Sequence, residues 1–192
     1  MRFLKEHFDD IVKLYVNQIG VALFAFFLYS AIDIELSISM LLKVLISVFS
    51  IGFYFSLLHV VSWEIGAKDK IRIDAGRMEP YPYKGIKLGL LANTPNFIVV
   101  GIALLCFIIY MLGGPLGFKS VFAVLNMIFR IFVSMYLGAL QGIFSFLSES
   151  EDAYYLWQTV GFLVFPLLAA LVTHLSYTMG LKEKRIFPTA KK

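Results

Sequence analysis

The chain has 192 residues, of which 59% are hydrophobic and 16% are charged, with 17 Lys and Arg residues against 13 Asp and Glu residues. A mean hydropathy of +0.80, with the apolar residues gathered in long blocks, excludes an ordinary soluble domain. The single cysteine, Cys106, excludes an intramolecular disulfide.

Residues 1–13 form a charged leader whose apolar residues recur at helical spacing. Phe3, Leu4 and Phe8 begin the pattern, and Ile11 continues it. A helix with one apolar and one charged face lies along a membrane surface. We therefore predict an amphipathic leader on the cytoplasmic face, before the chain turns into the bilayer.

Four apolar blocks follow, each long enough to cross about 30 Å of hydrocarbon as a helix. They cover residues 14–32, 40–63, 88–112 and 157–180. Lipid offers the backbone no hydrogen-bond partners, so blocks of this length satisfy their N–H and C=O groups internally. The sequence therefore predicts an all-α fold, a transmembrane helical bundle, with residues 1–192 forming a single membrane domain.

The segment between the last two blocks, residues 118–148, is apolar overall but carries polar residues at helical spacing. These are Lys119, Asn126, Arg130, Ser134, Gln141, Ser145 and Ser148. At about 100° per residue all seven fall within one stripe. The pattern predicts one long amphipathic helix, either external and interfacial or re-entrant, or crossing the membrane as a fifth span.

The distribution of basic residues favours four spans. If residues 118–148 do not cross, one side of the membrane holds every Lys and Arg except Lys43, Lys119 and Arg130. Such an excess marks the cytoplasmic side. If they do cross, the basic residues divide almost evenly, and Arg130 sits near mid-membrane at a cost of about 2.5–3.5 kcal/mol. We predict four spans with both termini cytoplasmic.

The entry into the third block carries a recognisable motif. The run from Tyr81 to Ala92, which begins Tyr-Pro-Tyr-Lys-Gly, is followed by Pro95 and Asn96. Together with the hydropathy profile and the basic end, this motif resembles a group of small, uncharacterised four-span integral membrane proteins of Gram-positive bacteria. The resemblance implies a topology and a location in the bacterial plasma membrane, but no activity.

Polar residues of the four spans are expected at one depth near the cytoplasmic membrane face. This candidate polar layer consists of Asn17, Gln18, His59, Asn93, Asn96 and His174. Intramembrane polar groups often mark solute or proton pathways, and His titrates near neutral pH. The same groups also serve as hydrogen-bonding contacts between helices, and this second interpretation is the one we favour.

The loop of residues 64–87 and the tail of residues 181–192 are basic and predicted to be cytoplasmic. Candidate contacts with anionic lipids or a protein partner are Lys68, Lys70, Arg72, Arg77, Lys182, Lys184 and Arg185. Each cation could gain about 1 kcal/mol beside an anionic leaflet, although the simpler interpretation is that these residues only set the topology. Nucleic-acid binding is not expected, because these cations lie at the membrane surface without a base-stacking motif.

Small residues and prolines suggest how the helices pack. The spacings Gly85 to Gly89 and Gly138 to Gly142 both allow close helix approach, either within the chain or with another subunit. Pro95, near the entry of the third span, and Pro166, within the fourth, are expected to kink those spans.

The chain carries no motif for catalysis, for a cofactor or for a metal ion, so we do not expect an enzyme. Four spans enclose little interior, and a transporter built from them would need several copies. The sequence therefore predicts a small non-catalytic membrane subunit or accessory protein that contacts the lipid bilayer and either another membrane subunit or further copies of itself. The alternative is a homo-oligomeric channel, or a transporter of a small solute or protons, that uses the polar layer.

Overall fold

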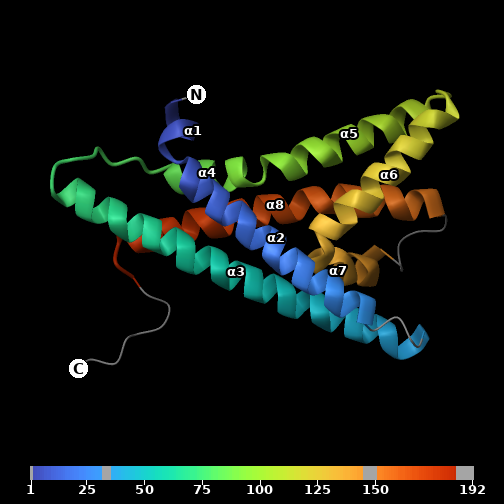
Figure 1. Cartoon of the computed structure of the whole chain (residues 1–192), viewed down its shortest axis with the longest axis horizontal. Helices are drawn as coiled ribbons and strands as arrows, with labels where there is room; N and C mark the ends of the chain where they lie inside the picture. Colours follow the sequence, from blue (N-terminus) through green and yellow to red (C-terminus); the bar gives the residue numbers. More distant parts are fainter. Residues whose placement is uncertain (1, 32–35, 145–150, 185–192) are drawn as a thin grey trace.

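The computed structural model describes residues 2–31, 36–144 and 151–184, and this part of the chain is helical apart from short connections. Its helices are α1 (Arg2–Glu6), α2 (Phe8–Ala31), α3 (Leu36–Asp74), α4 (Lys84–Ala92), α5 (Thr94–Met111), α6 (Leu116–Phe132), α7 (Ser134–Phe144) and α8 (Glu151–Leu181). Figure 1 shows their arrangement as an elongated bundle. The predicted all-α fold is confirmed.

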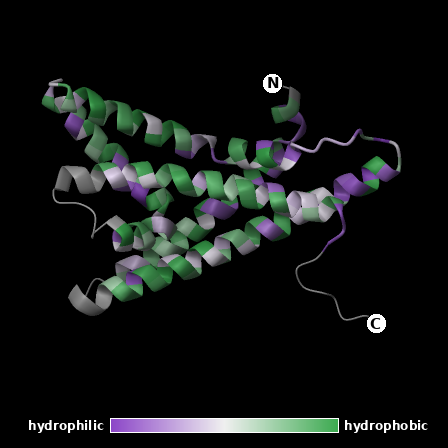
Figure 2. Cartoon of the chain, turned by 180° about the vertical axis from the view of Figure 1, so that it is seen from behind, coloured by the Kyte–Doolittle hydropathy of each residue, from purple (hydrophilic) through white to green (hydrophobic). Residues whose placement is uncertain are grey.

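Within the described residues, four helical segments are long and apolar enough to cross a membrane, and the bent pair of α6 and α7 is a fifth if it counts as one span. The four segments are Phe8–Ala31, Met40–Asp74, Thr94–Met111 and Leu156–Leu181. Their outward faces carry large apolar side chains, and Phe27 and Leu105 are 69% and 61% exposed. Figure 2 shows apolar residues along the helices and hydrophilic residues concentrated near the end that holds the N-terminal helix. Apolar surface on this scale requires lipid, so the chain is a multi-span integral membrane protein.

Several element boundaries differ from the sequence-based expectation, and α2, for example, begins at Phe8, within the expected leader. Helix α3 continues to Asp74, so the first half of the expected loop is helical and the non-helical connection covers residues 75–83. The third block is interrupted at Asn93, between α4 and α5. The interruption lies directly before the Thr94–Pro95 pair, where the proline ring has no N–H to continue the hydrogen bonds of α4.

The expectation of one long amphipathic helix over residues 118–148 is wrong for residues 118–144, and its last part, with Ser145 and Ser148, lies outside the described residues. The chain breaks at Val133 into α6 and α7, which are bent by 112° relative to each other. Val133, Met135 and Tyr136 are buried at the break, and the Ser134 hydroxyl donates a hydrogen bond to the Ala22 carbonyl of α2. The bend therefore lets both halves pack into the bundle, where a straight helix could bury only one stripe.

The contacts of α6 and α7 show that this bent pair enters the bundle and turns back, and it is called the re-entrant pair below. The break lies against Ala22, inside α2. Helix α7 then runs beside the start of α3, where the Gly138 N–H donates to the Ser47 hydroxyl at 2.8 Å. In Figure 1 the end of α5, the end of α7 and the start of α8 all lie at the end of the bundle opposite α1 and α4. The start of α2 and the end of α8 also lie at one end of the bundle, the end near α1 and α4 (Figure 1).

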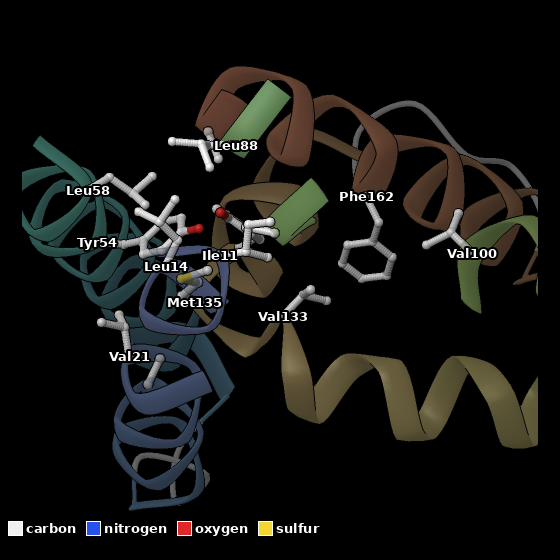
Figure 3. Close-up of a cluster of buried hydrophobic side chains, with 14 of the residues drawn as sticks. Ile11, Leu14, Val21, Tyr54, Leu58, Leu88, Val100, Val133, Met135 and Phe162 are labelled. Atoms are coloured by element: carbon white, nitrogen blue, oxygen red, sulfur yellow. The ribbon is translucent and has the colours of Figure 1, made fainter. Parts of the chain in front are cut away.

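The buried core lies where α2, α3, α4 and α8 meet the α6–α7 break. Leu14, Tyr54, Leu58 and Leu88 gather in one group there, and Val133 lies beside it (Figure 3). Aromatic contacts extend the core towards α8: Tyr136 stacks on Phe165 at 4.1 Å between ring centroids, and Phe129 meets Phe162 edge-on at 5.2 Å. This packing fixes α6 and α7 inside the bundle.

Both glycine pairs pack within the chain. A Cβ added to Gly89 would lie 2.6 Å from the Cα of Ala170 in α8, and one added to Gly85 would lie 2.9 Å from the Cα of His174. Gly138 lies still closer to the Lys43 carbonyl of α3, and a Cβ added to Gly142 would lie 3.0 Å from the Val44 side chain. Because lipid supplies no hydrophobic force between helices, such close backbone contact is a main source of their attraction. Helix α4 is thereby held directly against α8.

Candidate functional site

The residues of the candidate polar layer form separate, local hydrogen bonds. The Asn96 amide donates to the Asn93 side-chain oxygen at 3.1 Å, and the Asn93 amide donates to the Gly89 carbonyl at 2.9 Å. His59 Nδ1 lies 3.0 Å from the Ser176 hydroxyl on α8. These contacts join α4 to α5 and α3 to α8, so Asn93, Asn96 and His59 each have a partner.

The two histidines of the layer are not brought together. His59 contacts α8 at Ser176, whereas the Cα of His174 lies beside Gly85 of α4. Positions 174 and 176 are about 200° apart around a helix, so these contacts lie on different faces of α8. The buried Nδ1 of His174 and the buried Oε1 of Gln18 have no hydrogen-bond partner within the described residues.

A second polar cluster links α6 to α8. The Arg130 guanidinium donates to the Asn126 side-chain oxygen at 3.1 Å and to the Gln158 side-chain oxygen. The Asn126 amide in turn donates to the Thr159 hydroxyl at 2.8 Å. Arg130, a cation inside a hydrophobic segment, therefore donates its hydrogen bonds to neutral acceptors. The same bonds connect the re-entrant pair to α8.

Asn17 lies apart from these clusters, in an open groove between α2 and α3. The groove has a volume of about 510 Å³, and its lining is Val16, Asn17, Gly20, Val21, Phe24, Phe49, Phe53 and Leu57. Gly20 faces open space, since a Cβ there would meet nothing within 4 Å. The Asn17 amide has no hydrogen-bond partner in the described ranges. An amide that lies about 14 Å along a membrane-crossing helix therefore faces an apolar groove.

The end of the bundle near α1 contains a buried ion pair. Lys84 Nζ donates to Asp69 Oδ2 at 2.7 Å, and the Tyr177 hydroxyl donates to the same oxygen at 2.9 Å. The side chains of Lys84 and Asp69 are each only 2% exposed. Arg72 lies farther from the carboxylate, with 3.8 Å between its NH1 atom and Asp69 Oδ1.

Local sequence explains how these three groups meet. Asp69 is held on the last turns of α3, and Lys84 begins α4 directly after the Pro82–Tyr83 turn. Gly85, the next residue, allows α4 to approach Tyr177 of α8 closely. A buried charge is tolerated only when it is paired and hydrogen-bonded, so the triad ties α3, α4 and α8 together.

An open cavity of about 990 Å³ lies beside this triad. It is lined by Phe3, Glu6, His7, Arg72, Arg77, Met78, Tyr81 and Lys84. Burial, and then the positive charge of Lys84, lower the pKa of His7 below its ordinary value. His7 is therefore neutral at neutral pH, and the exposed cations at the cavity are Arg72 and Arg77.

The other predicted basic contacts lie outside this cavity. Lys68 pairs with Glu64 and Lys70 pairs with Asp74, each at 2.6 Å along α3. Lys182 and Lys184 are exposed after α8, and Arg185 lies outside the described residues.

The sequence reasoning missed the roles of Lys84, Asp69, Tyr177 and His7. In the sequence, Lys84 looks like one more basic residue of the predicted loop. Its place directly before Gly85, at the entry of an apolar block, was the available signal, because a lysine buried there needs a carboxylate.

Within the described ranges, no three His, Cys, Asp or Glu side chains gather in a way that could hold a metal ion. The chain matches no protein-family model, no curated protein and no solved structure.

Proposed function

We propose that this chain is a non-catalytic membrane subunit or accessory protein of the bacterial plasma membrane, which binds a transmembrane helix of another protein in the groove between α2 and α3. The observation that carries this proposal is the Asn17 amide, which faces the groove without a hydrogen-bond partner among the described residues.

An amide that lies in hydrocarbon without a hydrogen bond costs about 1–3 kcal/mol by protein mutational data. A partner helix that offers a Ser, Thr, Asn or Gln side chain would recover this cost, because polar side chains bond across helices in membranes. Gly20 lies on the next turn of α2 and lines the same groove, so the partner's backbone could approach closely.

The distribution of charge supports an orientation for the proposed subunit. Lys68, Lys70, Arg72, Arg77 and Lys84 lie at the end of the bundle where α3 ends and α4 begins. An excess of basic residues favours the cytoplasmic side. We therefore place this end, and both termini, in the cytoplasm.

A transporter that uses the polar layer has less support. His59 contacts Ser176 of α8, whereas His174, which is itself part of α8, lies beside Gly85 of α4. Asn93 and Asn96 are bonded to each other. Under that alternative, replacing both histidines by leucine abolishes function. Under the subunit proposal, the groove variants described next have the larger effect.

The test is quantitative co-purification in a gentle detergent, with Gly20→Leu compared with Gly101→Leu. Both glycines face open space, and leucine is the better helix former, so both variants should fold. Only Gly20 lies in the groove, whereas Gly101 lies on α5. A stoichiometric partner should accompany the wild type and Gly101→Leu, and should be lost from Gly20→Leu.

Asn17→Leu separates the hydrogen bond from groove shape. This substitution should weaken partner retention about 3-fold or more, in line with an interhelical hydrogen bond worth about 0.6–1.7 kcal/mol. A chain that purifies alone, or a partner that is retained equally by Gly20→Leu and Asn17→Leu, would contradict the proposal. A homo-oligomer dissociated by Gly20→Leu would identify the groove's occupant as a second copy and would likewise contradict it.

A further inference from the structure

The cavity beside the buried triad combines a positive rim with an aromatic wall. Its volume of about 990 Å³ lies within the range of about 300–1,000 Å³ that is typical of ligand sites. It lies at the end of the membrane-spanning part of α3, between the N-terminal segment and the start of α4. A ligand there would contact the region of the lipid headgroups.

The positive charge of the cavity is not cancelled by the triad. Asp69 is already bonded to Lys84 at 2.7 Å and to Tyr177 at 2.9 Å, so its charge is neutralised by a buried partner. The Arg72 side chain is 61% exposed, and its NH1 atom lies 3.8 Å from Asp69 Oδ1, which is too long for a strong hydrogen bond. Arg77 is exposed and has no ion-pair partner in the described part of the chain. Two guanidinium groups therefore remain available beside one acidic lining residue, Glu6.

The wall of the cavity suits the glycerol region of a lipid. Phe3 and Tyr81 lie with their ring centroids 6.1 Å apart. The Lys87 ammonium lies over both rings, 4.8 Å from the centroid of Tyr81 and 5.8 Å from that of Phe3. Aromatic side chains at this level combine an apolar body with a polar edge, as at other membrane interfaces. Lys87 adds a third cation above the wall.

We propose that this cavity binds the phosphate-bearing headgroup of an anionic phospholipid through Arg72 and Arg77. Guanidinium groups bind phosphate oxygens in pairs of parallel hydrogen bonds. Arg72 lies in the last turn of α3, and Arg77 lies in the connection directly after it. Lys84 acts on this site only by holding α4 in place, because its ammonium is bonded to Asp69. The site differs from the groove at Asn17 in both position and ligand.

The test is the titration of a fluorescent phosphatidylglycerol into the detergent-purified chain, with phosphatidylcholine as the neutral lipid. The variant is Arg72→Gln with Arg77→Gln. The matched control is Lys68→Gln with Lys70→Gln, which removes the same charge from the end of α3 but outside the cavity. Each cation contributes about fivefold beside an anionic surface. Affinity for phosphatidylglycerol should therefore fall by about 30-fold in the arginine variant and stay nearly unchanged in the lysine control.

Further measurements distinguish a specific lipid site from diffuse attraction and from a site for soluble phosphate. Arg72→Lys with Arg77→Lys retains the charge but not the paired hydrogen bonds of the guanidinium groups, so its affinity should fall between that of the wild type and that of the glutamine variant. Equal weakening in the arginine and lysine variants would show that attraction is diffuse, and it would overturn the site. Displacement of the lipid by millimolar inorganic phosphate would assign the cavity to a soluble phosphate and overturn the lipid assignment.

Discussion

Removing Lys84 from the buried triad tests how the bundle is held together. In Lys84→Met, the Asp69 carboxylate keeps its 2.9 Å bond from Tyr177 but loses its 2.7 Å bond from Lys84. Both charged side chains are 2% exposed, so water cannot easily replace the lost ammonium. Breaking a buried pair by removing one partner typically costs about 3–5 kcal/mol. We expect the lower end of this range, because Arg72 lies 3.8 Å from the same carboxylate.

A double-mutant cycle gives this prediction a second, sharper form. Asp69→Leu leaves the Lys84 ammonium buried alone and should also cost about 3 kcal/mol or more. The double variant Lys84→Met with Asp69→Leu leaves no buried charge, so it should be more stable than either single variant. The interaction energy of the cycle should therefore exceed about 2 kcal/mol.

The assay is reversible unfolding in mixed detergent micelles, followed by circular dichroism. Lys68→Met serves as the matched control, because it removes the same type of side chain from a pair whose residues are 59% and 58% exposed. This control should show no measurable change. Additive effects of the two triad substitutions, or a Lys84→Met variant as stable as the control, would refute the reasoning.

The remaining predictions concern one helix contact and one titration. Gly89→Leu places a side chain where a Cβ already lies 2.6 Å from the Cα of Ala170, so it should lower the free energy of unfolding by about 1–3 kcal/mol or more. Gly101→Leu, where a Cβ meets nothing within 4 Å, should not, and equal effects in the same assay would argue against the packing of α4 on α8. The pKa of His7 is lowered from 6.5 by burial and by Lys84, so the unfolded chain binds more protons just below pH 6.5. The stability that neutral His7 contributes is therefore present above that value and lost as the pH falls through the lower folded pKa. His7→Gln should flatten this part of the pH profile of unfolding, and an unchanged profile would contradict the assignment.

Local patterns were enough to predict the helices. The apolar blocks at residues 40–63 and 157–180 lie inside α3 and α8, because the length of a hydrophobic run is set by the thickness of the bilayer. The preference for four spans came from counting cations, which is also a local property. These features depend on the membrane and not on which helices are neighbours.

The break at Val133 could not be predicted in the same way. No proline or glycine marks it, and the polar stripe has a continuous helical period across it. The break depends instead on contacts with other helices, such as the bond from Ser134 to the Ala22 carbonyl and the approach of Gly138 to Lys43. A periodicity within one segment carries no information about these partners.

The triad was missed for a related reason. Asp69 and Lys84 are 15 positions apart and Tyr177 is far along the chain, so only the packing of α4 on α8 brings the three together. Each residue alone looks like an ordinary charged or aromatic residue at a membrane surface. The residues of the polar layer could likewise be named from their positions in the sequence, but their neighbours could not.

Labelling of single cysteines tests most directly the proposed architecture of four spans with a re-entrant α6–α7 pair. In a Cys106→Ala background, cysteines at Gly117, Ile143, Arg77 and Lys184 would be exposed in turn to a membrane-impermeant maleimide from each side of the membrane. The architecture predicts that Gly117 and Ile143 react from one side and that Arg77 and Lys184 react from the other. Reaction of Ile143 from the side opposite to Gly117 would make α6 and α7 a broken fifth span and contradict the account.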